Sequence, residues 1–422
     1  MFRIVTLFII FTLGCKGLFA QPLLLTIDTC YRLAEQNYPL VRQLGIIEKT
    51  QEYNLSNVAK GVLPVLWVQG QATYQSEVTR VPISFPGMSI EELSRDQYRL
   101  YGEVVQPITD LFTVHYQKEH ITATAQTEAQ KIKTELYKLR ERINQLFFGI
   151  LLLDVQIEQT QLLKKDIEAG LEKTNTAITN GAALKSSADV LKAELLKTDQ
   201  KTTELKANRR AYADMLGLFI NRSLPDETQL QTPPPPPTQT PPDITRPELQ
   251  LFKMQQDALA IQNKLLTAKN LPRFSLFLQG GIGRPALNML NNDFRGYYLG
   301  GLRLQWNLSG LYTYHTDRRL ISLSQEAIAV QQNVFLFNTQ IQLKQQNQEL
   351  AKLRQLLTSD AEIINLRQNI ANTTKNQLAY GTATPTDYLA HLNAQDQARL
   401  ALSMHQLQLI MTYYSLQVTA GK

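Results

Sequence analysis

The sequence has few of the residues that mark disulfide-rich, zinc-binding or helical membrane proteins. Among its 422 residues there are two cysteines, Cys15 and Cys30, too few for a disulfide framework or a cysteine-based zinc module. The longest internal apolar run is residues 146–153, well short of the roughly 20 residues that a membrane-spanning helix needs. These absences predict neither a disulfide-stapled fold nor a helical membrane protein.

Signals for catalysis, cofactors and nucleic acid are also missing. The net charge is +6 without a long basic run, so we expect no nucleic-acid partner. The five histidines lack metal-ligand spacing, and the glycine-rich stretch 280–283 leads into Arg284-Pro285 and not into a helix. No Ser/His/Asp or Cys/His nucleophile arrangement stands out. We therefore expect a protein that is not an enzyme and that binds neither metal nor cofactor.

The first twenty residues are typical of a secretory signal. Arg3 precedes an apolar stretch at 4–13, and small residues follow up to Ala20, which favours removal of residues 1–20. An alternative is a lipoprotein signal at Thr-Leu-Gly-Cys15, which resembles a lipobox but has Thr where Leu is usual. Cleavage after Ala20 would leave Cys30 as the one thiol, expected to be a packed helix residue.

An internal repeat organises the rest of the chain. The stretch Ala-Lys-Gly-Val-Leu-Pro at 59–64 is similar to Ala-Lys-Asn-Leu-Pro at 268–272, and the two prolines are 208 residues apart. The stretches 178–182 and 378–382 are also similar, at a spacing of 200. A longer loop in the first half, around 81–92, accounts for the difference. The repeat predicts two related halves.

A proline-rich segment separates the halves. Residues 233–237 are five consecutive prolines, which favour extended polyproline II and make a semi-rigid spacer. The predicted organisation is therefore a signal peptide at 1–20, a first repeat at 21–231, a linker at 232–242 and a second repeat at 243–422.

Each half contains two strands of alternating polar and apolar residues, expected at 63–80, 95–106, 272–284 and 295–308. Leu66, Val68 and Tyr74, for example, alternate with glutamines. Such strands are long enough to cross a bilayer when tilted, but four cannot close a barrel alone, so a membrane barrel requires oligomerisation. Aromatic residues near the strand ends fit an interfacial belt: Trp67, Tyr74, Tyr98, Phe274, Tyr298 and Trp306.

Very long helices follow the strands. Residues 110–177 and 311–380 contain no proline, and the second contains no glycine, so each predicts a helix of about 100 Å with coiled-coil-like packing. Turns at Gly181 and Gly381 are expected to end these helices in a left-handed conformation. Shorter helices are predicted at 28–60, 187–218, 246–269 and 386–419.

This order of elements, twice over, resembles the TolC family of outer-membrane efflux proteins. The motifs that carry the resemblance are Gly-Val-Leu-Pro at 61–64, Leu-Pro at 271–272, Gln-Pro-Ile-Thr-Asp at 106–110, Leu-Gln-Trp-Asn-Leu-Ser-Gly at 304–310 and the helix-tip sequence 380–389. Each motif alone is weak, but their ordered duplication over nearly all of residues 25–420 is specific.

The resemblance implies a mainly α-helical fold with a β-barrel portion. Three copies would share one 12-stranded barrel in the outer membrane, and their helices would form a tunnel across the periplasm. Family members work with a periplasmic adaptor and an inner-membrane transporter, in efflux or type I secretion. In such a barrel Arg99, Glu103, Arg303 and Gln305 would face the lumen, although a solvated strand face explains their polarity equally well.

The family carries a ring of aspartates at the periplasmic tip. Asp387 matches the first of these, whereas the second position is Ala390. Asp387 is as typical of a helix N-cap or first-turn acid as of a gate. Asp189, after Gly181, is a less regular match, and Leu378 and Ala383 stand where the family's closing contacts have Tyr and Arg.

A second class of function is a periplasmic coiled-coil adaptor or scaffold, soluble or lipid-anchored through Cys15. Adaptors also contain long helical hairpins. They have one hairpin beside a lipoyl-like domain, however, and this chain has two similar halves, which favours the channel.

Overall fold

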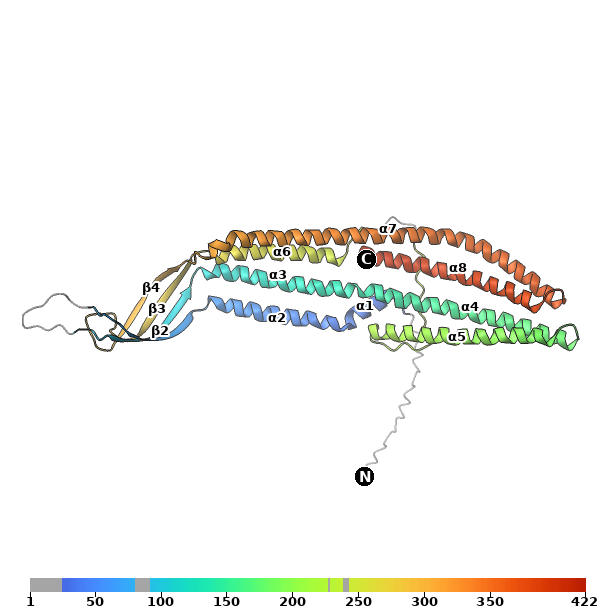
Figure 1. The fold of residues 1–422 in the computed structure, drawn as a ribbon, viewed down its shortest axis with the longest axis horizontal. Coiled ribbons are helices and arrows are strands. Elements are labelled where there is room, and N and C mark those ends of the chain that lie inside the picture. Colours follow the sequence, from blue (N-terminus) through green and yellow to red (C-terminus); the bar gives the residue numbers. More distant parts are fainter. Residues whose placement is uncertain (1–24, 80–91, 227, 238–242) are drawn as a thin grey trace, which may run out of the picture. The chain divides into compact units, whose positions relative to one another are not determined.

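The computed structural model of the chain describes residues 25–79, 92–226, 228–237 and 243–422 (Figure 1). The expected signal at 1–20, Cys15, most of the loop expected at 81–92 and linker residues 238–242 lie outside this part. The chain divides into two compact units, and each unit takes segments from both halves of the sequence. We describe each unit by itself.

One unit contains the sheet and the helices attached to it. Its elements are α2 (Arg42–Ala59), β1 (Val65–Tyr74), β2 (Asp96–Pro107), α3 (Asp110–Tyr137), α6 (Pro247–Lys269), β3 (Arg273–Arg284), β4 (Arg295–Gln305) and the first part of α7 (Gly310–Ala379). Helix α3 packs along α2 and α6 (Figure 1). Pro247 stands at the start of α6, where its missing N–H costs no helical hydrogen bond.

The sheet has four antiparallel strands in sequence order, β1-β2-β3-β4. Leu66 lies opposite Val104, which lies opposite Leu278, and neighbouring residues such as Gln279 are opposite Glu103. Because residues directly opposite each other share a face, one face is apolar and the other polar. The alternation expected from the sequence is therefore continuous across all four strands.

The other unit is helical. It contains α1 (Ile27–Asn37), α4 (Leu139–Thr179), α5 (Lys185–Ile220), the second part of α7 and most of α8 (Pro385–Ala420). Helices α4 and α5 pack along each other up to the turn that joins them (Figure 1). Near that turn a buried cluster joins three helices, formed by Ile167, Leu191, Tyr388, Leu389 and Leu392.

Two predicted helices are interrupted. The helix expected at 28–60 ends at Asn37, and Tyr38 is extended before Pro39, because a residue preceding proline avoids the helical conformation. The helix expected at 110–177 is divided only at Lys138, which keeps helical dihedral angles and donates from its N–H to the Thr134 carbonyl at 3.3 Å, so the chain stays helical from Asp110 to Thr179. In the second half α7 continues without a break through 70 residues, a rise of about 105 Å.

The helical stretch Asp110–Thr179 contains an 18-residue window apolar enough, by length and composition, to cross a membrane, and 28% of that window is buried. The sequence analysis did not predict this window, because it found no apolar run of sufficient length. Core helices of soluble proteins pass the same test, so the window alone does not indicate a membrane span.

Candidate functional site

The apolar face of the sheet is uncovered within the described part of the chain. Leu66, Val68 and Tyr298 are 74%, 82% and 81% exposed. Further exposed apolar side chains share this face: Tyr74, Tyr98, Leu100, Phe274, Leu276, Leu278, Ile282, Leu302 and Leu304. A continuous apolar surface of this kind marks contact with a protein or a membrane.

The opposite face carries polar side chains that bond across the strands. The Tyr101 hydroxyl donates to Gln69 Oε1 at 2.5 Å, and Gln279 Nε2 donates to the Tyr297 hydroxyl at 3.4 Å. The predicted lumen residues Arg99, Glu103, Arg303 and Gln305 all lie on this face. Trp67 lies here too, opposite Glu103, and not on the apolar face that carries Tyr74, Tyr98, Phe274 and Tyr298.

Glu103 and Arg303 form an ion pair on this polar face. Arg303 Nη2 is 2.5 Å from Glu103 Oε1, and its guanidinium lies 4.4 Å from the centroid of the Phe277 ring. Glu103 is 7% exposed, so its carboxylate is shielded from solvent where it pairs with the guanidinium. The two residues are 200 positions apart. Equivalent positions of the two repeats thus carry opposite charges that bind each other.

The two helix turns have the same backbone conformation. Gly181 and Gly381 have φ of 73° and 71°, the left-handed region that favours glycine. The N–H of Ala182 donates to the Ala177 carbonyl at 2.8 Å, and the N–H of Thr382 donates to the Gln377 carbonyl at 2.9 Å. These bonds define a Schellman motif at each turn. The left-handed glycines are as the sequence predicted.

The helix after each turn begins differently. Thr384 caps α8: its Oγ1 donates to Asp387 Oδ2 at 2.6 Å and accepts from the Asp387 N–H at 3.2 Å. Asp387 Oδ2 also accepts from the Thr384 N–H at 3.1 Å, which completes a capping box. The Thr384 hydroxyl and then its N–H lower the pKa of Asp387. Asp387 is therefore a first-turn acid that partners the cap, which is one of the two roles expected from the sequence, and the Thr-x-x-Asp spacing could have identified Thr384 as the cap itself.

The first turn lacks this arrangement. Leu184 stands at the N-terminus of α5, without a side-chain cap, and is 74% exposed. Ser187 occupies the position equivalent to Asp387, so Asp189 lies two residues further along α5, exposed. Asp189 and Asp387 are therefore not equivalent residues of the two repeats.

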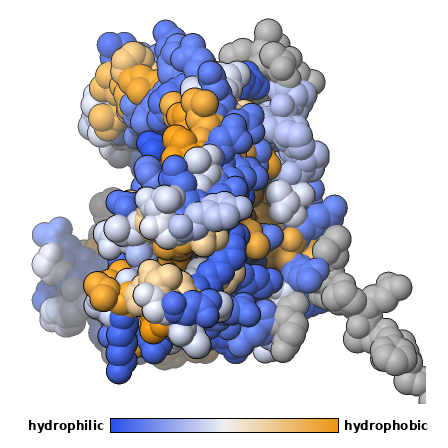
Figure 2. Space-filling model, turned by 90° about the vertical axis from the view of Figure 1, so that its right-hand side faces the viewer, coloured by the Kyte–Doolittle hydropathy of each residue, from blue (hydrophilic) through white to orange (hydrophobic). Residues whose placement is uncertain are grey.

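Leu378 is packed against apolar side chains near the second turn. Leu378 packs against the buried cluster of Ile167 and Tyr388, and the Tyr388 hydroxyl donates to the Asp166 carbonyl at 3.2 Å. Burial raises the pKa of Tyr388 to about 12, so this tyrosine stays neutral. Figure 2 looks onto the end that carries the turns, where the surface is largely hydrophilic with separate small apolar patches.

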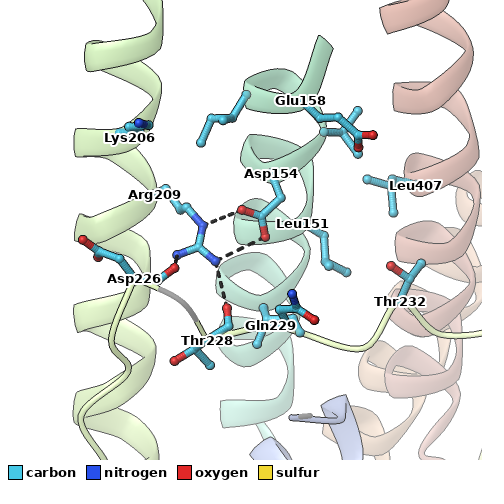
Figure 3. Close-up of a pocket in the computed structure, with 13 residues that line it drawn as sticks. Leu151, Asp154, Glu158, Lys206, Arg209, Asp226, Thr228, Gln229, Thr232 and Leu407 are labelled. Carbon is cyan, nitrogen blue, oxygen red and sulfur yellow. Dashed lines mark hydrogen bonds and ion pairs between the residues drawn. The ribbon is translucent and has the colours of Figure 1, made fainter. Parts of the chain in front are cut away.

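A cavity of about 640 Å³ lies between α4 and α5, beside the segment that follows α5 (Figure 3). Arg209 pairs with Asp154 inside it and donates to the carbonyls of Asp226 and Thr228 at 3.0 and 2.9 Å. The arginine thus uses its donors to hold the chain segment that leads to the linker. Sequence reasoning missed this clamp because its residues are far apart in the chain.

Within the described residues, no three His, Cys, Asp or Glu side chains gather to hold a metal ion. Cys30 is fully buried, and burial raises the pKa of its thiol to about 12. A thiol of this kind is unreactive, because the thiolate is the nucleophile.

Comparison with known proteins shows the fold. No protein-family model matches the sequence, and no curated protein matches it. Among solved structures, the outer membrane protein VceC of Vibrio cholerae is similar at 13% identity and a TM-score of 0.65, over 94% of this chain and 96% of that chain. The CmeC outer membrane channel of Campylobacter jejuni is similar at 13% identity and a TM-score of 0.63, over 94% and 85%.

A third similar structure is the open state of the MtrE outer membrane channel of Neisseria gonorrhoeae, at 13% identity and a TM-score of 0.65, over 94% of this chain and 89% of that chain. The chain has the fold of these outer-membrane channels. The resemblance to the TolC family is confirmed at the level of the fold.

Proposed function

We propose that this protein is an outer-membrane channel, the exit duct of a tripartite efflux pump or a type I secretion system. The observation that carries the proposal is the sheet, which combines an uncovered apolar face with a polar one. Alternation of this kind is what a transmembrane barrel strand needs, because every second side chain meets lipid. The likeness to outer-membrane channels supports the same conclusion.

The sheet also has two edges that need partners. In the described part of the chain, β1 and β4 each pair on one side. An unpaired edge leaves backbone donors and acceptors unsatisfied, which a membrane does not tolerate. Three copies joined β4 to β1 would close twelve strands, place the apolar face towards lipid, and line the lumen with Arg99, Glu103, Arg303 and Gln305.

The helical unit supports a symmetric trimer in a different way. Tyr388 of α8 packs over Gly170 of α4, where an added Cβ would lie 2.8 Å from the tyrosine ring. The equivalent residues, 200 positions away, are Ala188 on α5 and Ile370 on α7, and Ile370 is 40% exposed. If the two repeats alternate around a threefold axis, α5 of one copy packs on α7 of the next and covers the exposed Ile370.

We assign the helix turns to the periplasmic end, where an adaptor and an inner-membrane pump would open the channel. Gly181 and Gly381 would keep the turns tight, and Asp387 and Asp189 would lie near the mouth. The predicted signal at 1–20 accounts for export, with lipidation at Cys15 as its alternative. The channel itself would be a passive conduit without catalytic residues.

Neighbouring residues on opposite faces provide the test. Leu278→Arg places a charge on the proposed lipid face, at a cost of up to about 2–4 kcal/mol per chain, whereas Gln279→Arg places the same charge on the polar face. We expect Leu278→Arg to reduce the amount of trimer recovered from outer membranes with detergent, and Gln279→Arg to leave it near the wild-type level. Recovery of the wild-type protein from the periplasm without detergent, or equal effects of both substitutions, would contradict the proposal.

A further inference from the structure

The polar face of the sheet carries an excess of positive charge. Its strand residues include one acid, Glu103, and four arginines, Arg99, Arg273, Arg295 and Arg303. A closed trimer would present three copies of this set to one lumen. The charge is therefore a property of the face as a whole.

Two of these arginines lie in one row across the sheet. Arg99 on β2 and Arg295 on β4 are both opposite Gly283 of β3, which has no side chain to separate them. The Cγ of Arg99 lies 3.3 Å from the position that a Cβ on Gly283 would occupy, so the arginine side chain extends over the glycine. The row presents two cations at the end of the sheet far from the helices.

Acidic partners neutralise little of this charge. Arg303 is paired with Glu103, but Arg273 and Arg295 are 3.8 Å from Asp110 and Asp293, and their side chains are 54% and 62% exposed. Exposed pairs at such distances are weak. Arg99 has no carboxylate within ion-pair distance among the described residues. The row of Arg99 and Arg295 therefore keeps most of its positive charge.

The excess of positive charge is confined to the polar face of the sheet. The strand residues on the apolar face include one arginine, Arg284, and one acid, Asp96, and these two form an ion pair. The guanidinium of Arg284 also lies 5.4 Å from the ring centroids of Tyr98 and Phe294. Charge on this face is balanced within one ion pair, whereas Arg273 and Arg295 on the polar face have exposed side chains.

We propose that the barrel section of this channel favours anions, so that its exported substrates are anionic solutes, and that Arg99 and Arg295 determine this selectivity. The inference rests on the proposed function, because the polar face lines a lumen only in a closed barrel. Fixed charge in a narrow passage raises the local concentration of counter-ions and sets which ions pass. Glu103 opposes this preference weakly, since Arg303 already neutralises it.

Ion selectivity in planar bilayers tests the inference. Asp387→Asn serves as the background, because it removes the acid that would favour cations at the other end of the channel. Under a KCl gradient we expect a reversal potential close to the equilibrium potential of chloride. Adding Arg99→Gln and Arg295→Gln should move the reversal potential towards the equilibrium potential of potassium. Arg284→Gln, the same change of charge on the apolar face, should leave it unchanged.

Dye binding provides a second measurement that does not depend on an open tip. A trisulfonated pyrene dye should bind the detergent-solubilised trimer, lose most of its affinity in the Arg99→Gln/Arg295→Gln variant, and keep its affinity in Arg284→Gln. Cation preference of the Asp387→Asn channel, or equal dye binding by all variants, would overturn the inference. The proposed function would survive either result, because it is judged by the membrane insertion of the Leu278→Arg and Gln279→Arg variants.

Discussion

The two helix turns, residues 180–184 and 380–384, have the same backbone conformation but differ in the side chains that cap the following helix. Both end a long helix with a glycine at positive φ and the same pair of capping hydrogen bonds. The helix that follows is capped by Thr384 and Asp387 in one repeat and begins at an exposed Leu184 in the other. A glycine and backbone hydrogen bonds determine the path of the chain at both turns, so the turn conformation does not depend on the side chains that follow it.

The same divergence extends along the helices and into the sheet. Tyr388 of the second repeat packs over Gly170 of the first, whereas the residues equivalent to this pair are Ala188 and the exposed Ile370. Glu103 and Arg303 differ in sign and bind each other. At this pair, equivalent positions of the two repeats carry opposite charges instead of the same residue.

The largest effect is expected from Tyr388→Ala, which gives the second repeat the residue of the first. Tyr388 is 1% exposed, and truncating a buried aromatic side chain costs about 3 kcal/mol or more. Amide hydrogen exchange of residues 385–395, followed by mass spectrometry, should become much faster. Tyr380→Ala is the matched control, because Tyr380 is 84% exposed. Equal effects of the two substitutions would show that the buried contact is unimportant.

A smaller effect is expected from exchanging the helix caps. Thr384→Ala removes the capping side chain, at about 1 kcal/mol, and should speed exchange in the first turn of α8. Leu184→Thr combined with Ser187→Asp copies the Thr-x-x-Asp pattern into α5 and should slow exchange in its first turn. If the copied pattern gives no protection, the difference between the turns does not come from these side chains.

The smallest effect concerns Asp396, whose equivalent is Leu196. Burial raises the pKa of Asp396 to about 6, with Arg399 lowering it and Asp166 raising it. A raised folded-state pKa favours folding below the unfolded pKa of about 3.9 and loses that contribution as pH rises through about 6. Asp396→Asn should therefore raise the thermal midpoint relative to wild type above pH ~7, with no difference near pH ~4.

The half-buried position of Asp396 keeps this effect small, because solvent screens the charge. The thermal midpoint of the detergent-solubilised protein measures it across the pH range. A constant difference between wild type and variant at every pH would mean that Asn changes packing and that ionisation of Asp396 is not involved.

Much of the fold was predictable because it depends on local chemistry. Period-two alternation predicted four strands and their faces, and the glycine turns and the proline-free runs predicted the long helices. Two interruptions were missed. Pro39 was a visible signal, whereas Lys138 follows no helix-breaking residue. The candidate site was predicted in part: the polar strand residues lie on one face, but the cap formed by Thr384 and the ion pair of Glu103 were not foreseen.

The sequence by itself determined which side chains share a strand face and where the helices turn, since both follow from periodicity and from the conformations that glycine allows. Tertiary structure alone decided which residues far apart in the sequence come together: Arg303 pairs with Glu103, Tyr388 packs over Gly170, and Arg99 and Arg295 lie in one row on either side of Gly283. Such contacts depend on strand register and helix packing, which bring together groups that no local pattern relates.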